Sequence, residues 1–269
     1  MADSLALAEV VAPVITAPLL LKVVRLHKRF AGASGEIEAL RDVSLDVARS
    51  EFVCLLGASG CGKSTLLRLI GGFEAPSEGR IMLNGAPVRG PGPERGMVFQ
   101  DYGLFPWLSV RRNIEFGPAA RGLPRDQVRT IGERFISMIG LTRFADAFPH
   151  QLSGGMKQRV AIARVLANDA ALILMDEPFG ALDAMTRERL QLELLQLWEA
   201  TGLTVLFVTH AIEEAILLAD RVVVMSTGPG RVSEVVPVGL PRPRDVASPD
   251  FNALRRKLAA LLNAGQNSL

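Results

Sequence analysis

Unbroken apolar runs and helical periodicities alternate along the second half of this 269-residue chain. Runs such as Val-Leu-Phe-Val at 205–208 and Val-Val-Val-Met at 222–225 are typical of strands buried on both faces of a parallel sheet. Alternation of such strands with helices favours a parallel sheet covered by helices. The expected elements are helices at 154–167, 184–200 and 211–219, and strands at 171–176, 203–208 and 221–226.

The first hundred residues follow another pattern, in which short apolar segments are separated by turn residues. The elements expected there are strands at 19–30 and 39–47 joined by a Gly-rich turn, a buried strand at 51–56, a helix at 63–70, short strands around Asn84-Gly85 and a strand at 96–100. The first two strands read as an antiparallel hairpin. Gly71-Gly72 ends the helix, and Asn-Gly is typical of hairpin turns.

The remaining segments divide the chain further. Residues 101–151 are helical segments interrupted by prolines, which predicts an inserted helical lobe. In the tail, Ser248-Pro249-Asp250 is a good helix start, and the apolar residues after it fall on one helical face, so we expect a tail helix docked on its own core. The predicted organisation is a loose N-terminal extension at 1–18, a core formed by 19–100 and 152–230, a helical subdomain at 101–151, and a tail with a short amphipathic helix at 231–269.

Composition and charge exclude several classes of function. The net charge of +2 is too small to indicate nucleic acid binding. The arginines at 111–112 and 121–134 are interpreted as a solvated face, with a surface near anionic lipid headgroups as the alternative. Residues 5–24 are mostly apolar but contain Glu9, Pro13, Pro18 and Lys22, which argues against a membrane-spanning helix. The two cysteines indicate no disulfide framework and favour a reducing compartment.

A glycine-rich phosphate-binding loop follows the strand expected at 51–56 and opens a helix. Backbone amides of such a loop cradle phosphate oxygens at a helix N-terminus. Lys63 is expected to reach the β- and γ-phosphates, and Ser64 to ligate Mg²⁺. The ATP-binding candidates in this loop are Gly57, Ser59, Gly60, Cys61, Gly62, Lys63, Ser64 and Thr65.

Two acidic residues, Asp176 and Glu177, stand at the end of the apolar strand Leu-Ile-Leu-Met. Unpaired buried carboxylates are costly, so a structural role alone is a poor explanation. Asp176 is expected to hold Mg²⁺ through water, and Glu177 to act as general base toward the attacking water. Successive strand residues face opposite sides, which fits one acid for the metal and one for the water.

A second anion-binding helix start is predicted at Leu152–Met156. Ser153 and the exposed amides of Gly154 and Gly155 precede the helix expected at 154–167. One chain already has a phosphate site in its first loop. The second site makes sense if two copies face each other head to tail, each capping the other's ATP.

The order of phosphate-binding loop, Ser-Gly-Gly-Met, Asp-Glu and a lone His210 at a strand end resembles the ABC transporter ATPase family. The resemblance implies an α/β fold with a P-loop NTPase core of RecA type, an antiparallel β subdomain and an inserted helical subdomain. It implies ATP and Mg²⁺ as cofactors, Gln100 as a sensor of Mg²⁺ and γ-phosphate, and His210 as a γ-phosphate sensor. It also assigns Asp183 to a loop that communicates across a dimer and Phe30 to stacking on adenine. The sequence departs from the family at Met156, where glutamine is commonest.

Within the family, several segments look like the nitrate, sulfonate and taurine import ATPases, among them 90–100, 104–114, 176–184 and 226–231. This likeness implies a subunit peripheral to the cytoplasmic face of a bacterial inner membrane. Its partners would be a second ATPase subunit (an identical copy, with a different subunit as the alternative), permease subunits and indirectly a solute-binding protein, and not nucleic acid. Segment 101–117 would receive the permease through Leu104, Phe105, Trp107 and Leu108, unless these residues form a local core. The implied function is ATP-driven uptake of a small anionic solute. The alternatives are an exporter subunit and a non-transport ABC ATPase that acts on nucleic acid. The second alternative would predict a long coiled coil between Lys63 and Ser153, and the sequence there has no heptad pattern.

Overall fold

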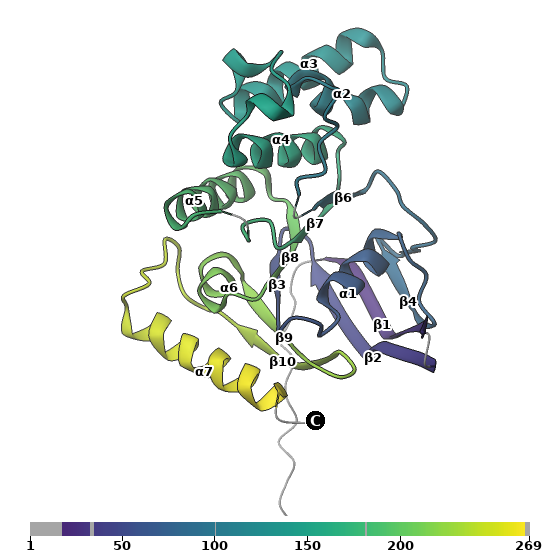
Figure 1. The fold of residues 1–269 in the computed structure, drawn as a ribbon, viewed down its shortest axis with the longest axis vertical. Coiled ribbons are helices and arrows are strands. Elements are labelled where there is room, and N and C mark those ends of the chain that lie inside the picture. The colour runs from purple at the N-terminus through teal and green to yellow at the C-terminus, as the bar shows by residue number, and fades with distance from the viewer. Residues whose placement is uncertain (1–17, 33–34, 100, 181, 267–269) are drawn as a thin grey trace, which may run out of the picture.

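The structure is a computed structural model, which describes residues 18–32, 35–99, 101–180 and 182–266. Apart from Pro18, the N-terminal extension expected at 1–18 lies outside the described residues, and so does Gln100. The described part is a mixed α/β structure with two sheets and a group of helices at one end (Figure 1).

The larger sheet is the parallel sheet that the alternating pattern predicts. Its strand order is β10 (Arg231–Pro237), β9 (Arg221–Ser226), β3 (Phe52–Leu56), β8 (Thr204–Thr209), β7 (Leu172–Asp176) and β6 (Arg95–Val98). All neighbours pair in parallel except β10, which runs antiparallel to β9 at one edge. Strands β3 and β8 are buried along their whole length, as strands covered on both faces must be.

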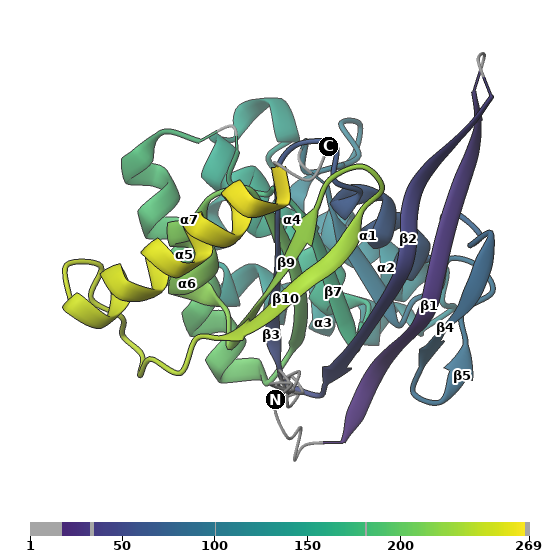
Figure 2. The same cartoon turned by 90° about the horizontal axis from the view of Figure 1, so that it is seen from below.

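The smaller sheet is antiparallel, in the order β2 (Gly35–Ala48), β1 (Leu19–Gly32), β4 (Glu78–Leu83) and β5 (Ala86–Pro87). Strands β1 and β2 form the predicted hairpin, which extends beyond the rest of the sheet (Figure 2). Helix α1 (Lys63–Gly71) packs against this sheet through Leu66 and Leu67, in a core shared with Leu40 of β2. This packing places the hairpin beside the loop that precedes α1.

The helices at the other end are α2 (Val110–Ala120), α3 (Arg125–Met138) and α4 (Gly154–Ala167), with short 3-10 turns at Thr142–Phe144 and Pro149–Gln151. Figure 1 shows them together at the top of the molecule. Helix α4 packs against α2 and α3 and also against β6, where Val165 fills the space beside Gly96. Because α4 joins both parts, the division of the chain at residue 151 stays a prediction.

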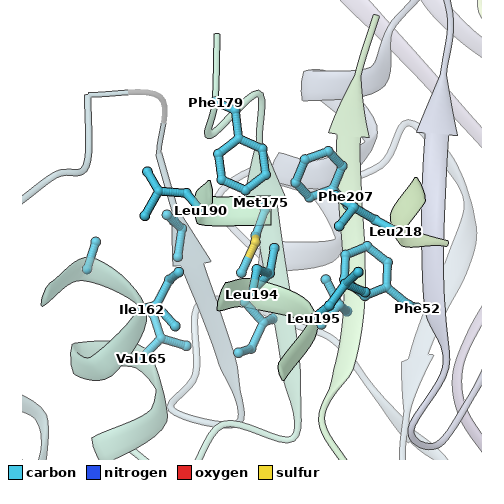
Figure 3. Close-up of a cluster of buried hydrophobic side chains, with 14 of the residues drawn as sticks. Phe52, Ile162, Val165, Met175, Phe179, Leu190, Leu194, Leu195, Phe207 and Leu218 are labelled. Carbon is cyan, nitrogen blue, oxygen red and sulfur yellow. The ribbon is translucent and has the colours of Figure 1, made fainter. Parts of the chain in front are cut away.

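The main core lies between the parallel sheet, α4 and helix α5 (Ala184–Thr201) (Figure 3). Its centre is aromatic: the ring of Phe207 lies 5.9 Å from that of Phe52 and 5.7 Å from that of Phe179. Leu190 and Leu194 of α5 close it on the helix side. Phe179 belongs to the segment after Glu177, so this core also anchors the chain beside the acidic pair.

The tail differs from the sequence prediction in two respects. Residues 231–237, placed in the tail by the prediction, form β10, which the sequence pattern missed because an edge strand is only half-buried and lacks a continuous apolar run. The following helix α7 (Pro249–Gln266) has 18 residues, and so is not short. The expectation that it docks on its own core is confirmed, since Phe251 and Leu258 are fully buried near α6 (Ile212–Leu218) and β9. Within the described part of the chain, no helix is long and apolar enough to cross a membrane.

Candidate functional site

The loop between β3 and α1 has the shape that phosphate binding requires. Gly62, at φ +89°, adopts a left-handed conformation that favours glycine, and a Cβ there would lie 2.5 Å from Leu40 Cδ2. A Cβ on Gly57 would lie 2.5 Å from Cys61 Sγ and 2.9 Å from Met225 O. The backbone of the loop therefore leaves no space for a side chain at either position. Glycine stands at both positions in the sequence, which makes this close packing possible.

The side chain of Lys63 turns back into this loop. Its ammonium donates hydrogen bonds to the carbonyl oxygens of Gly57 at 2.8 Å and Ala58 at 2.9 Å, and the residue is only 5% exposed. It also lies 3.6 Å from Cys61 Sγ. A buried cation that has only uncharged partners favours an anion beside it. The positive charge thus lies against the backbone of the phosphate-binding loop.

Ser64 and Asp176 come from distant parts of the chain and meet at the carboxyl edge of the sheet. The Ser64 hydroxyl donates to Asp176 Oδ1 at 2.9 Å. Burial raises the pKa of Asp176, while the hydrogen bond from Ser64 opposes the rise. Hydroxyl and carboxylate oxygens are the ligands that Mg²⁺ prefers, and Mg²⁺ takes few protein ligands beside phosphate oxygens and water. The described residues hold no cluster of three or more His, Cys, Asp or Glu that could bind a metal.

Glu177 and His210 form the second pair at this edge. Glu177 Oε2 lies 3.0 Å from His210 Nδ1, and the two side chains are 25% and 60% exposed. Glu177 has φ +45°, a left-handed conformation in which a non-glycine residue carries strain of about 1–3 kcal/mol. Its amide donates to Val208 O at 3.1 Å, which holds the turned backbone against β8. The carboxylate is therefore aimed away from the strand and kept accessible to water.

Sequence reasoning missed the buried residues that hold His210 in place. Glu214 of α6 is 8% exposed; its carboxylate accepts a hydrogen bond from Thr209 Oγ1 at 2.6 Å and another from Gln191 Nε2 at 3.0 Å. Thr209 Oγ1 in turn accepts from the amide of Ala211 at 3.0 Å, so both neighbours of His210 are fixed. The only signal in the sequence was an acidic residue one helical turn after His210, and burial of that residue could not be read from it.

The predicted second helix start is formed as expected. Ser153 caps α4 and accepts a hydrogen bond from the amide of Met156 at 3.3 Å. Asp183 caps α5 in the same way, with the amide of Thr186 at 3.0 Å, and this hydrogen bond holds the pKa of Asp183 below its ordinary value. The two caps are neighbours, since a Cβ on Gly154 would lie 3.3 Å from Leu182 Cδ2. With the amides of Gly154 and Gly155, they make a second group of candidate residues.

The predicted site residues thus fall into two groups in one chain. The first consists of the phosphate-binding loop, Asp176, Glu177 and His210, at the carboxyl ends of β3, β7 and β8. The second lies at the starts of α4 and α5. Figure 1 shows α4 among the helices of the upper end and α1 in the lower half. Gln100, expected to sense Mg²⁺ and the γ-phosphate, lies outside the described residues.

Phe30 lies near the end of β1, where it pairs with Ile37 of β2. The hairpin passes the phosphate-binding loop, because Leu40 of β2 touches Gly62. The ring of Phe30 is half-buried, and the Lys28 ammonium lies 4.6 Å from its centroid. Stacking of adenine on Phe30 stays a prediction.

Some residues of the segment expected to bind a permease are exposed, and others pack into the protein. Phe105 is half-buried, with ring centroids 4.6 Å from Phe116 and 5.6 Å from Trp107, and Trp107 is 70% exposed. Leu104 instead packs against the main core, as the local-core alternative would have it. Leu108 lines a groove of about 920 Å³ between α2 and α3, which apolar side chains share with several arginines, among them Arg111, Arg112, Arg125 and Arg129. The exposed aromatics and this groove together form a surface that fits a protein partner.

Comparison with known proteins places these features in context. Residues 40–180 match the family described as ABC transporter. The chain is 50% identical over 242 residues to an uncharacterized ABC transporter ATP-binding protein of Methanocaldococcus jannaschii, covering 90% of this chain and 91% of that protein. It is 50% identical over 214 residues to the taurine import ATP-binding protein of Roseobacter denitrificans, covering 79% and 80%.

A nitrate import ATP-binding protein of Synechocystis is 46% identical over 221 residues, covering 82% of this chain and 83% of that protein. Among solved structures, the dimeric post-hydrolysis state of an ATP-binding cassette bound to ADP and phosphate superposes with a TM-score of 0.71 at 33% identity. That match covers 81% of this chain and 99% of the other. The family match spans the phosphate-binding loop, the acidic pair and the cap of α4.

Proposed function

The chain belongs to the ABC transporter family and is an ATPase, and from this premise we propose that it is the ATP-hydrolysing subunit of an importer. The observation that carries the proposal is the meeting of Lys63, the Ser64–Asp176 pair and the Glu177–His210 pair at one edge of the sheet. These groups supply a cation for phosphate, oxygens for a metal and a base for water.

The chemical step follows from the positions of these side chains. The loop amides and Lys63 hold the β- and γ-phosphates. Ser64 and Asp176 are the residues that would hold Mg²⁺, which would offset the negative charge of the phosphates. Glu177 accepts a proton from the water that attacks the γ-phosphorus, as the bond to the β-phosphate oxygen breaks. His210 Nδ1 lies 3.0 Å from the Glu177 carboxylate and orients it toward the γ-phosphate.

A complete site needs a second copy of the chain. Ser153, Gly154 and Gly155 lie apart from the chain's own phosphate-binding loop, and so we propose that they cap the ATP held by the partner copy. Two Mg-ATP molecules are then enclosed between two copies, with Asp183 at the contact between them. Closure is favoured because only the closed dimer completes both sites, and hydrolysis reopens it.

The same proposal assigns the partners. The groove between α2 and α3 with the exposed Trp107 receives a permease, on the cytoplasmic side of the cell membrane. A solute-binding protein on the other side delivers the solute to that permease. Relatives named for taurine and nitrate import support a small anionic solute, which the chain itself does not contact.

Growth of a deletion strain tests the function as a whole. The gene is deleted in its native host, and growth is measured with taurine, an alkanesulfonate or nitrate as the single source of sulfur or nitrogen. Loss of growth on one source, restored by the wild-type gene and not by Glu177→Gln, is the expected result. It would identify the solute class and show that hydrolysis drives uptake.

Two other outcomes would count against the proposal. Unimpaired growth on every source would remove the assignment to small-anion import. Restoration of growth by Glu177→Gln would mean that uptake does not depend on this carboxylate. Glu199→Gln, an exposed glutamate near the end of α5, serves as the matched variant that should restore growth fully.

A further inference from the structure

The guanidinium of Arg164, in the helix that begins at the Ser-Gly-Gly cap, has no acidic side chain beside it in the part of the chain that the structure describes. Arg164 is in the last turn of α4, is half-buried, and forms no ion pair within the described residues. Burial lowers the pKa of its guanidinium, with no carboxylate to oppose the shift. A buried charge without a counterion is costly, so its hydrogen bonds must offset that cost.

Those hydrogen bonds all go to the segment that joins β6 to α2. Nη1 donates to Gly103 O at 2.6 Å and Nη2 to Tyr102 O at 3.4 Å, while the guanidinium lies 5.4 Å from the centroid of the Phe105 ring. Tyr102 and Gly103 both have positive φ, at +65° and +53°. For Tyr102 this conformation is strained, and the two carbonyls it turns toward α4 are the ones that Arg164 binds.

The same segment is also held at the other end of α4. A Cβ on Gly154 would lie 3.3 Å from the Tyr102 hydroxyl oxygen, so the phenol lies against the Ser-Gly-Gly cap. Gly154 and Arg164 are separated by about 15 Å along the helix axis. Residues 102–105 are thus tied to α4 at its first and its last turn.

This segment leads to two features of the proposed function. On one side it follows β6 and position 100, where the resemblance places the nucleotide sensor. On the other side Phe105 packs on Phe116 and Trp107, the exposed aromatics of the permease surface. A helix that carries both this segment and the second ATP contact would move them as one body.

We propose that Arg164 is a positioning residue for ATP turnover: it clamps residues 102–105 to α4, so that the Ser-Gly-Gly cap and the Trp107 surface move together. The proposal rests on the proposed function, because the cap must bind a partner copy's ATP for the movement to begin. Without the clamp, ATP still binds at the phosphate-binding loop, but contact of ATP with the cap no longer moves the Trp107 surface.

The test uses the full chain with Arg164→Met, which keeps the aliphatic stem and removes all donors, and Arg164→Lys, which keeps the charge without the planar fork. Arg143→Met is the matched control, because Arg143 is exposed and makes no hydrogen bond or ion pair in the described part of the structure. ATPase kinetics should show kcat lowered between about tenfold and a hundredfold in Arg164→Met, with KM for ATP unchanged within about twofold. Arg164→Lys should be intermediate.

A second readout follows the movement itself. Trp107 is one of two tryptophans, and Trp198→Phe leaves it as the only one. In that background Mg-ATP should change the Trp107 emission of the wild type and of Arg143→Met, and the change should be lost in Arg164→Met at saturating ATP. Amide hydrogen exchange of residues 101–105 should slow on addition of Mg-ATP in the wild type and not in Arg164→Met.

The outcomes separate the two levels of the argument. A wild-type chain without ATPase activity would overturn the proposed function. An active wild type together with unchanged kcat and unchanged Trp107 response in folded Arg164→Met would overturn the clamp alone. A loss confined to thermal stability, with kcat per folded chain unchanged in Arg164→Lys, would assign Arg164 a structural role and also overturn it.

Discussion

At the scale of single residues, this site depends on small structural details that fix a few polar groups. Glu177 is strained at φ +45° and Lys63 is buried against two carbonyls. Neither arrangement is favourable for folding alone. Such groups are maintained where their chemistry is needed, which is why the strain and the buried charge coincide with the candidate site.

Removal of the proposed base should separate binding from turnover. In Glu177→Gln the amide keeps the size and a hydrogen-bonding oxygen near His210 but cannot accept a proton. We expect ATP to bind normally, ATPase kcat to fall about 10²–10⁴-fold, and a dimer to persist with ATP. Steady-state ATPase assays and size-exclusion chromatography with Mg-ATP measure both effects. Wild-type turnover would remove Glu177 as the base; Glu199→Gln is the control.

Loss of the loop cation should instead affect binding. Lys63→Ala removes the ammonium that lies inside the phosphate-binding turn. A charge-assisted contact to phosphate is worth at least about 1.4 kcal/mol here, so ATP affinity should fall about tenfold or more. Equilibrium binding of a fluorescent ATP analogue checks this. Lys22→Ala, at an exposed position of β1, should bind like the wild type, and unchanged affinity in Lys63→Ala would contradict the assignment.

At the scale of elements, the carboxyl ends of parallel strands gather the chemistry, and β10 with α7 closes the sheet at its far edge. Strands β3, β7 and β8 each end at a site residue or just before one. Helix α7 crosses this edge of the molecule in Figure 2, held by Phe251 and Leu258 and by the ion pairs of Arg255 with Glu213 and Lys257 with Glu234. The exposed ion pairs contribute little, so apolar burial holds this helix.

Truncation of the buried anchor of α7 should measure that burial. Phe251 is 1% exposed, and Phe251→Ala should lower the free energy of unfolding by about 3–5 kcal/mol through lost burial and a cavity. Arg256→Ala, at an exposed position of the same helix, should change it by less than about 0.5 kcal/mol. Urea unfolding followed by circular dichroism makes the comparison. Equal effects of the two substitutions would mean that α7 is not held by its apolar face.

At the scale of the whole molecule, the two groups of candidate site residues lie in different parts of one chain. The surface proposed for the permease lies on the lobe that carries the second group. The core between α4, α5 and the parallel sheet joins these parts through Phe179, Phe207 and their neighbours (Figure 3). A contact at the α4 cap is therefore positioned to act on the Trp107 surface without passing through the first site.

A charge placed on that surface should prevent assembly without harming the fold. Trp107 is 70% exposed, so Trp107→Asp should leave the thermal midpoint of the isolated chain within about 2 °C of the wild type. Co-purification with the permease subunits should be lost, because a carboxylate would enter an apolar contact. Trp107→Phe, which keeps an apolar ring, should assemble. Normal assembly of Trp107→Asp would exclude this surface as the docking site.

The sequence by itself determined the local structures and most of the chemistry. Helix α4 and strand β9 have the bounds that periodicity predicts. The glycines, Lys63 and the Asp176–Glu177 pair pointed to the candidate phosphate site, because their spacing is a local property of the chain. Only the tertiary structure decided the pairing of Ser64 with Asp176 and of Glu177 with His210. It also decided the antiparallel place of β10, the burial of Glu214 and the contacts of Arg164 with Tyr102 and Gly103. These features depend on which distant segments meet, and hydrophobic periodicity specifies which face of an element is buried without specifying its neighbour.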